Sequence, residues 1–176
     1  MANLNLINIM DTNFMFGGKG NSVNLSGNPA KSKYGSSERY ALIKVPDPHQ
    51  AFELKEKGVT VMETEPREDQ DPDDFVPDYF IRGILSYQDK YGNKHRYPPE
   101  IYLVNENEEA VPLDEDAAGP TIDKLADKGA VKAVHVILNI AKKQNGDGFK
   151  LYIKTMYVEQ NIDDDPIASR FKRWKG

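Results

Sequence analysis

The sequence contains no cysteine and no long hydrophobic run, and each absence excludes a class of protein. Without cysteine, the 176-residue chain can have no disulfide framework, no thiolate nucleophile and no cysteine-ligated zinc. No run approaches the roughly 18 to 20 apolar residues that span a bilayer, and the first residues lack the regions of a signal peptide. We therefore expect a cytoplasmic protein that does not bind membranes and is stabilised by packing alone.

An excess of positive charge is also missing. The chain has 28 acidic and 23 basic residues, with a formal net charge of -5. This total argues mildly against a protein that coats nucleic acid, because phosphate binding needs a positive face. The acidic residues, however, crowd into residues 63–78, 106–116 and 163–165, whereas many lysines and arginines fall on or beside expected strands. An acidic total can therefore coexist with a basic groove.

Motifs for nucleotide hydrolysis and for metal binding are missing as well. The glycine-rich residues 17–20 lack the serine or threonine that a phosphate loop requires after its lysine. The three histidines are spread without metal-ligand spacing, and the acidic runs lack the spacing and the glycine of a calcium loop. We therefore expect a binding protein that is not an enzyme and needs no metal and no cofactor.

One pattern resembles an enzyme signature. Pro46-Asp47 followed by Glu53-Leu54-Lys55 matches the residue types of the PD-(D/E)xK nucleases, in which two carboxylates bind the metal and the lysine assists the attacking water. Here the glutamate and the lysine fall on an expected helix, whereas those enzymes carry them on strands. A nuclease is therefore a third-ranked alternative, and magnesium-dependent cleavage of DNA would identify it.

Segments with β-strand propensity recur along the chain and predict a mainly β fold. The clearest signal is the last pair of strands, which the turn Asn145-Gly146-Asp147-Gly148 separates. The expected strands are residues 39–45, 59–62, 79–88, 94–97, 101–104, 131–141 and 149–160.

Two short helices are expected between these strands. The first begins after a capping Asp47, has an apolar stripe that includes Phe52, and ends at Gly58. The second covers residues 120–128. Strands interrupted by two helices predict a mostly antiparallel β-barrel with short helical insertions, and an oligonucleotide-binding (OB) fold fits this description best.

We expect one domain, residues 1–176, with three irregular segments. The first is an N-terminal arm, about residues 11–37, which is rich in glycine and asparagine and much of which we expect to be mobile. The second is an acidic loop, about residues 63–77, in which three prolines oppose regular structure. The third is a basic C-terminal tail, about residues 163–176.

Aromatic rings and cations occur together on the expected strands, chiefly in residues 87–97 and 150–154. Proteins that bind single-stranded nucleic acid use rings to stack on bases and cations to follow phosphates. The alternative is an ordinary solvated hairpin with half-buried tyrosines. The candidate nucleic-acid-binding residues are Arg39, Tyr40, Tyr87, Lys90, Tyr91, Lys94, Arg96, Tyr97, Lys150, Tyr152 and Lys154.

Side chains alternate across a strand, so the last strand should present two different faces. Phe149, Leu151, Ile153 and Tyr157 are expected to face the core, and Lys150, Tyr152, Lys154 and Met156 to face outward. The inverted register remains open, because both faces contain apolar residues.

Read in order, several segments resemble a family of small bacteriophage single-stranded DNA-binding proteins with an OB fold. The resemblance extends over nearly the whole chain. The matching segments include Asn13-Phe14, Arg39-Tyr40, Ala51-x-x-Leu54-x-x-x-Gly58-Val59, Pro99-x-Ile101-x-Leu103-Val104, Leu113-Asp114-Glu115, Ile122-Asp123, Phe149-Lys150-Leu151-Tyr152-Ile153-Lys154 and Asp164-Asp165-Pro166.

The resemblance implies a protein that binds single-stranded DNA without sequence preference during phage DNA replication or recombination, in the cytoplasm of the host cell. Phage replication or recombination proteins are the further partners it implies. The chain departs from the family at Asn139-Ile140-Ala141, where a tryptophan is expected, and in its basic tail, where many such proteins are acidic. A different class remains as the second alternative, namely a phage interaction or inhibitor protein that binds a host protein.

Overall fold

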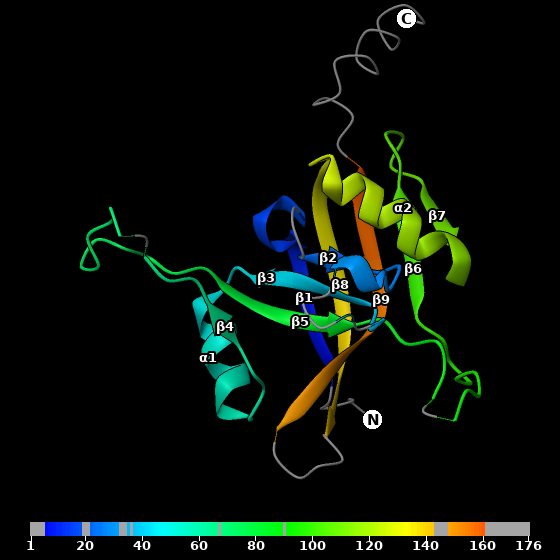
Figure 1. Cartoon of the computed structure of the whole chain (residues 1–176), viewed down its shortest axis with the longest axis horizontal. Coiled ribbons are helices and arrows are strands. Elements are labelled where there is room, and N and C mark those ends of the chain that lie inside the picture. The colour runs from blue at the N-terminus through cyan, green and yellow to red at the C-terminus, as the bar shows by residue number, and fades with distance from the viewer. Residues whose placement is uncertain are drawn as a thin grey trace, which may run out of the picture.

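The computed structural model describes residues 6–18, 22–31, 35, 37–66, 68–89, 91–142 and 148–160. β-strands dominate these residues, as the sequence predicts (Figure 1). The strands are β1 (Leu6–Thr12), β2 (Val23–Asn24), β3 (Tyr40–Val45), β4 (Met62–Glu63), β5 (Tyr79–Ile84), β6 (Glu100–Val104), β7 (Ala110–Leu113), β8 (Val131–Lys142) and β9 (Phe149–Gln160). The helices are α1 (Pro48–Glu56) and α2 (Glu115–Asp127), with short 3-10 turns η1 (Met15–Gly18) and η2 (Pro29–Lys31).

The strands pair in the order β1-β8-β9-β5-β3-β2, and β6 joins β9 and carries β7. Every pair is antiparallel except β5–β9 and β6–β9. Among the described residues the ladders run along an open path, but an isolated bridge joins Phe14, just after β1, to Ile43 of β3. The mainly β, mostly antiparallel class is confirmed, and this order gives the partly open Greek-key barrel of an OB fold.

Strand β9 pairs with two different strands, β5 and β6, along one of its edges. Its first half pairs with β5 through Gly83–Leu151 and Ile84–Tyr152, and its second half pairs with β6 from Glu100–Thr155 onward. Along its other edge the register to β8 shifts between the pairs Leu138–Ile153 and Ile137–Thr155. Lys154 is therefore an extra, unpaired residue, which is the geometry of a β-bulge.

This bulge resets the alternation of side chains along β9. Before it, the prediction is confirmed, because Leu151 and Ile153 are buried and Lys150 is exposed. After it, the prediction is wrong for Met156, which is fully buried, and for Tyr157, which is 37% exposed. Tyr157 stacks outside the core on Tyr102 of β6, with ring centroids 4.7 Å apart.

Several other elements differ from expectation. The sequence analysis missed β1, in which three of seven residues are exposed, and β7, in which three of four are exposed. Helix α2 begins five residues earlier than expected, since Asp114 caps it by accepting a hydrogen bond from the N–H of Ala117 and the helix continues through Pro120. Residues 94–97 form only an isolated bridge, Gln88–Lys94, rather than a strand.

The other helix follows the prediction more closely. Asp47 caps α1 by accepting from the N–H of His49, and Gly58 follows it with a positive φ. Phe52 is 62% exposed, however, so the expected apolar stripe is reduced to Ala51 and Leu54. No helix in the described part of the chain is long and apolar enough to cross a membrane.

A buried carboxylate fixes part of the N-terminal arm, which we expected to be mobile. Asp123 of α2 is 5% exposed and accepts hydrogen bonds from the N–H groups of Leu25 (2.8 Å) and Ser26 (3.1 Å) and from the Ser26 hydroxyl. Gly119, one helical turn earlier, allows this approach, because a Cβ there would lie 2.6 Å from the Cα of Ser26. Leu25 and Ser26 of the arm are therefore anchored on α2.

We predict that Asp123→Asn lowers the free energy of unfolding by about 2 kcal/mol. The amide leaves a single acceptor oxygen for several donors, and bonds to charged groups contribute about 1.5 to 3 kcal/mol each. Urea unfolding followed by circular dichroism measures the loss. Asp73→Asn, which makes the same change of charge in the exposed acidic loop, should stay within about 0.5 kcal/mol of the wild type. Equal stability of the two variants would contradict a structural role for Asp123.

Candidate nucleic-acid interface

The change of partner along β9 leaves an opening in the sheet. Strand β5 ends at Ile84 opposite Tyr152, and β6 begins at Glu100 opposite Thr155. Between these two positions the chain leaves the sheet as residues 85–99 and then returns to it (Figure 1). The loop that carries most of the predicted tyrosines and cations therefore starts and ends beside Tyr152 and Lys154.

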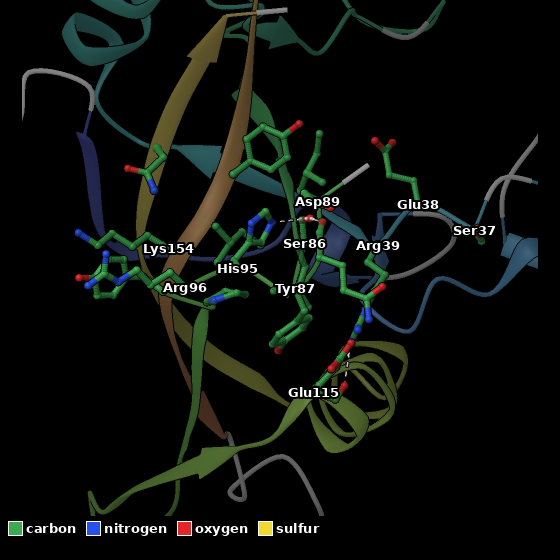
Figure 2. Close-up of a pocket in the computed structure, with 18 of the residues that line it drawn as sticks. Ser37, Glu38, Arg39, Ser86, Tyr87, Asp89, His95, Arg96, Glu115 and Lys154 are labelled. Atoms are coloured by element: carbon green, nitrogen blue, oxygen red, sulfur yellow. Dashed lines mark hydrogen bonds between the residues drawn. The ribbon is translucent and has the colours of Figure 1, made fainter. Parts of the chain in front are cut away.

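A cleft of about 1010 Å³ lies between this loop, the start of β3 and the middle of β9 (Figure 2). Its residues are Ser37, Glu38, Arg39, Ile84, Leu85, Ser86, Tyr87, Gln88, Asp89, Tyr91, His95, Arg96, Tyr97, Pro99, Glu115, Asn139, Tyr152, Ile153 and Lys154. The cleft thus combines segments that are far apart in the sequence.

The charges of the cleft are unevenly distributed. In Figure 2, Arg96 and Lys154 lie on one side of the view, and Glu38, Arg39 and Glu115 lie on the other. Because the two cations share one side, that end of the cleft offers a place for phosphates.

Two of the acidic residues of the cleft are occupied by other groups. The Asp89 carboxylate accepts the N–H groups of Tyr91 (2.9 Å) and Asn93 (3.0 Å), which closes the tip of the loop. Glu38 forms an ion pair with Arg82 of β5. Both interactions reduce the repulsion that these carboxylates would exert on a phosphate.

The aromatic rings differ in their availability. Tyr91 is 76% and Tyr97 is 81% exposed, and the Arg96 guanidinium lies 5.5 Å from the centre of the Tyr97 ring. Tyr152 is half-buried and lines the cleft from β9. These three rings can stack on unpaired bases without a rearrangement of the sheet.

Arg39 and Tyr87 form a structural pair inside the cleft. Arg39 donates from Nε to the carbonyl oxygen of Leu25 (2.5 Å) and from Nη2 to that of Glu115 (3.0 Å), and its guanidinium lies 4.9 Å from the Tyr87 ring centre. Burial raises the pKa of Tyr87, the nearby Arg39 lowers it, and Glu115 and Asp114 raise it further. Within the described residues, the buried Tyr87 hydroxyl has no hydrogen-bond partner.

The structure brings most of the predicted site residues together. Seven of them line the cleft, namely Arg39, Tyr87, Tyr91, Arg96, Tyr97, Tyr152 and Lys154. Lys94 and Lys150 are exposed beside it, whereas Lys90 lies outside the described residues. Tyr40 is only 7% exposed, because the Arg82 guanidinium covers its ring at 4.0 Å.

The sequence analysis missed Arg82, although alternation along 79–84 with Ile81 in the core would have placed it on the outer face. It also missed the contribution of Asn139 and of Glu115, which no local pattern reveals, because their position depends on the packing of β8 and α2 against the cleft.

The residues of the nuclease pattern lie on and next to helix α1. Asp47 caps α1, and Glu53 lies on that helix, as expected. Lys55 forms an ion pair with Glu63 at 3.7 Å. The described residues contain no group of three or more side chains that could hold a metal ion.

Comparison with known proteins finds similarity among solved structures. No family model matches the chain, and no curated protein matches its sequence. Among solved structures, the chain is similar to gp2.5, a single-stranded DNA-binding protein encoded by bacteriophage T7. The two share 13% identity, with 92% of this chain and 94% of that chain covered, at a TM-score of 0.37. Strand order, register and side-chain contacts are the evidence for the fold and the cleft described above.

We predict that Tyr87→Phe is neutral or stabilises the fold by about 1 kcal/mol at pH 7, because it removes a buried hydroxyl without a partner. Because the pKa of Tyr87 is raised in the folded protein, its hydroxyl loses the proton at a lower pH in the unfolded chain. The wild type therefore loses stability as pH rises past 10.0, the ordinary pKa of tyrosine. Urea unfolding at pH 7 and pH 10.5 measures both effects. A clear loss of stability in Tyr87→Phe at pH 7 would contradict this account of Tyr87. So would a loss of stability between pH 7 and pH 10.5 that is as large in the variant as in the wild type.

Proposed function

We propose that this chain binds single-stranded DNA, without sequence preference, in the cleft beside β9. The observation that carries the proposal is that exposed tyrosines and cations from separate segments converge on one groove. Tyr91 and Tyr97 offer ring faces there, Tyr152 lines the groove from the sheet, and Arg96 and Lys154 supply positive charge. Stacking of rings on bases, with cations on the backbone, is how proteins bind single strands irrespective of sequence.

The position of the cleft in the fold supports the same proposal. In an OB fold, oligonucleotides bind on the face of the second and third barrel strands and on the neighbouring loops. These two strands correspond to β3 and β5, and the cleft begins where β3 starts and β5 ends. A ligand in this cleft would therefore occupy the surface that this type of barrel uses for nucleic acid.

The proposed setting is phage DNA replication or recombination in the host cytoplasm, where single strands need protection. This part of the proposal rests on the resemblance of the sequence to phage single-stranded DNA-binding proteins. Phage replication or recombination proteins are the proposed further partners, and the chemistry of the cleft requires no cofactor.

The first test is a titration of fluorescently labelled oligo(dT) at two salt concentrations. The wild type should bind, and binding should weaken as salt rises, because phosphate contacts release counterions. The double variant Arg96→Gln/Lys154→Gln should bind more weakly, and the slope of log K against log salt should be smaller by about 1.4, which is about 0.7 for each lost contact.

The matched control is Lys55→Gln/Lys57→Gln, which removes the same charge at α1, on the far side of the molecule from the loop 85–99 (Figure 1). It should leave the slope unchanged. If the wild type fails to bind, or if both double variants lose the same slope, the cleft is not the binding site.

We predict that Tyr152→Ala and Ile153→Ala, which change adjacent residues of β9, have opposite effects. Tyr152→Ala should weaken oligo(dT) binding by about 1 to 3 kcal/mol with a small effect on folding, because its ring faces the cleft. Ile153→Ala should lower the free energy of unfolding by about 2 to 5 kcal/mol, because the residue is 3% exposed. Thermal melts and titrations measure the two effects, and the reverse pattern would place the ligand on the other face.

A further inference from the structure

A cation outside the cleft lies on the same face of the sheet. Arg82 is exposed on the outer side of β5, where its guanidinium lies 4.0 Å from the centre of the Tyr40 ring of β3. The same group forms an ion pair with Glu38, a residue that lines the cleft. The Arg82 side chain is 42% and the Glu38 side chain 34% exposed, so solvent reaches the pair.

The register of the strands connects Arg82 with the proposed binding surface. Gly83 pairs with Leu151 and Ile84 with Tyr152, so Arg82 and Lys150 occupy corresponding positions on the neighbouring strands β5 and β9. Arg82 directly precedes Gly83, and Lys150 directly precedes Leu151. Both side chains are exposed on the outer face. Tyr152 therefore has the cations Arg82 and Lys150 on one side along the strands and Lys154 on the other.

We propose that Arg82 is a phosphate-binding residue and that Glu38 occupies its guanidinium until DNA arrives. The inference rests on the proposed function and adds one backbone contact to it. On binding, a phosphate of the single strand replaces the Glu38 carboxylate at Arg82, and Glu38 turns to solvent.

Three physical features support this exchange. A carboxylate and a phosphate present similar oxygen pairs to the arginine fork, so one can substitute for the other. An ion pair that solvent reaches is weak, so its loss opposes binding only slightly. The Tyr40 ring keeps the guanidinium in place during the exchange, because a cation over a ring face is attracted to it.

The test measures oligo(dT) affinity and its salt dependence for Glu38→Gln. This change frees Arg82 in the unbound protein, so affinity at low salt should rise at least threefold, whereas the salt slope should stay that of the wild type, because the same phosphate contact forms in both complexes. Arg82→Gln should bind more weakly than the wild type. The combined variant Glu38→Gln/Arg82→Gln should lose the whole gain, because the gain acts through Arg82.

The matched control is Glu63→Gln, which breaks the Lys55–Glu63 ion pair with the same change of charge. It should change affinity less than twofold. Thermal melts establish that each variant is folded, and Arg82→Lys, which keeps the charge and loses the fork, should show an intermediate affinity.

Two results would overturn the inference while the proposed function stands. In one, Glu38→Gln shows no gain although the wild type binds oligo(dT). In the other, the gain persists in Glu38→Gln/Arg82→Gln, which would show that it comes from removing a negative charge near the cleft. If the wild type does not bind at all, the proposed function itself fails.

Discussion

The bulge at Lys154 is the feature on which the site depends. It allows β9 to pair with β8 along its length while its other edge changes from β5 to β6. The change of partner creates the opening through which residues 85–99 leave the sheet. It also keeps Ile153 and Met156 in the core on either side of Lys154, so the cleft lies directly over a packed interior. In a regular strand, Ile153 and Met156 are three residues apart and would face opposite sides, so one of them would lie outside the core.

A second constraint determines the opposite wall of the cleft. The buried Asp123 carboxylate attaches Leu25 and Ser26 to α2, and Arg39 bonds to the carbonyl oxygens of Leu25 and Glu115. The start of β3, the arm and the start of α2 therefore form one hydrogen-bonded unit. These hydrogen bonds hold Arg39 at the wall of the groove, where its guanidinium lies against the Tyr87 ring.

The electrostatics of the chain depend on where charges are paired and not on their sum. The net charge of -5 includes an acidic loop that extends away from the sheet (Figure 1). In the cleft, Asp89 is occupied by backbone N–H groups and Glu38 by Arg82, whereas Arg96 and Lys154 lie on the same side in the view of Figure 2. Local pairing of carboxylates therefore makes an acidic protein compatible with the proposed polyanionic ligand.

The sequence by itself determined the mainly β class, the hairpin of β8 and β9, helix α1 with its cap, and the burial of Leu151 and Ile153, because these follow from local propensity and period. It also identified seven of the nineteen residues that line the cleft, four of them in the cluster of tyrosines and cations at 87–97. Only the tertiary structure decided the outward turn of Tyr157, the burial of Tyr40 beneath Arg82 and the anchoring of the arm by Asp123. Each of these depends on a bulge or on a contact between residues distant in the chain, and no local pattern encodes such a contact.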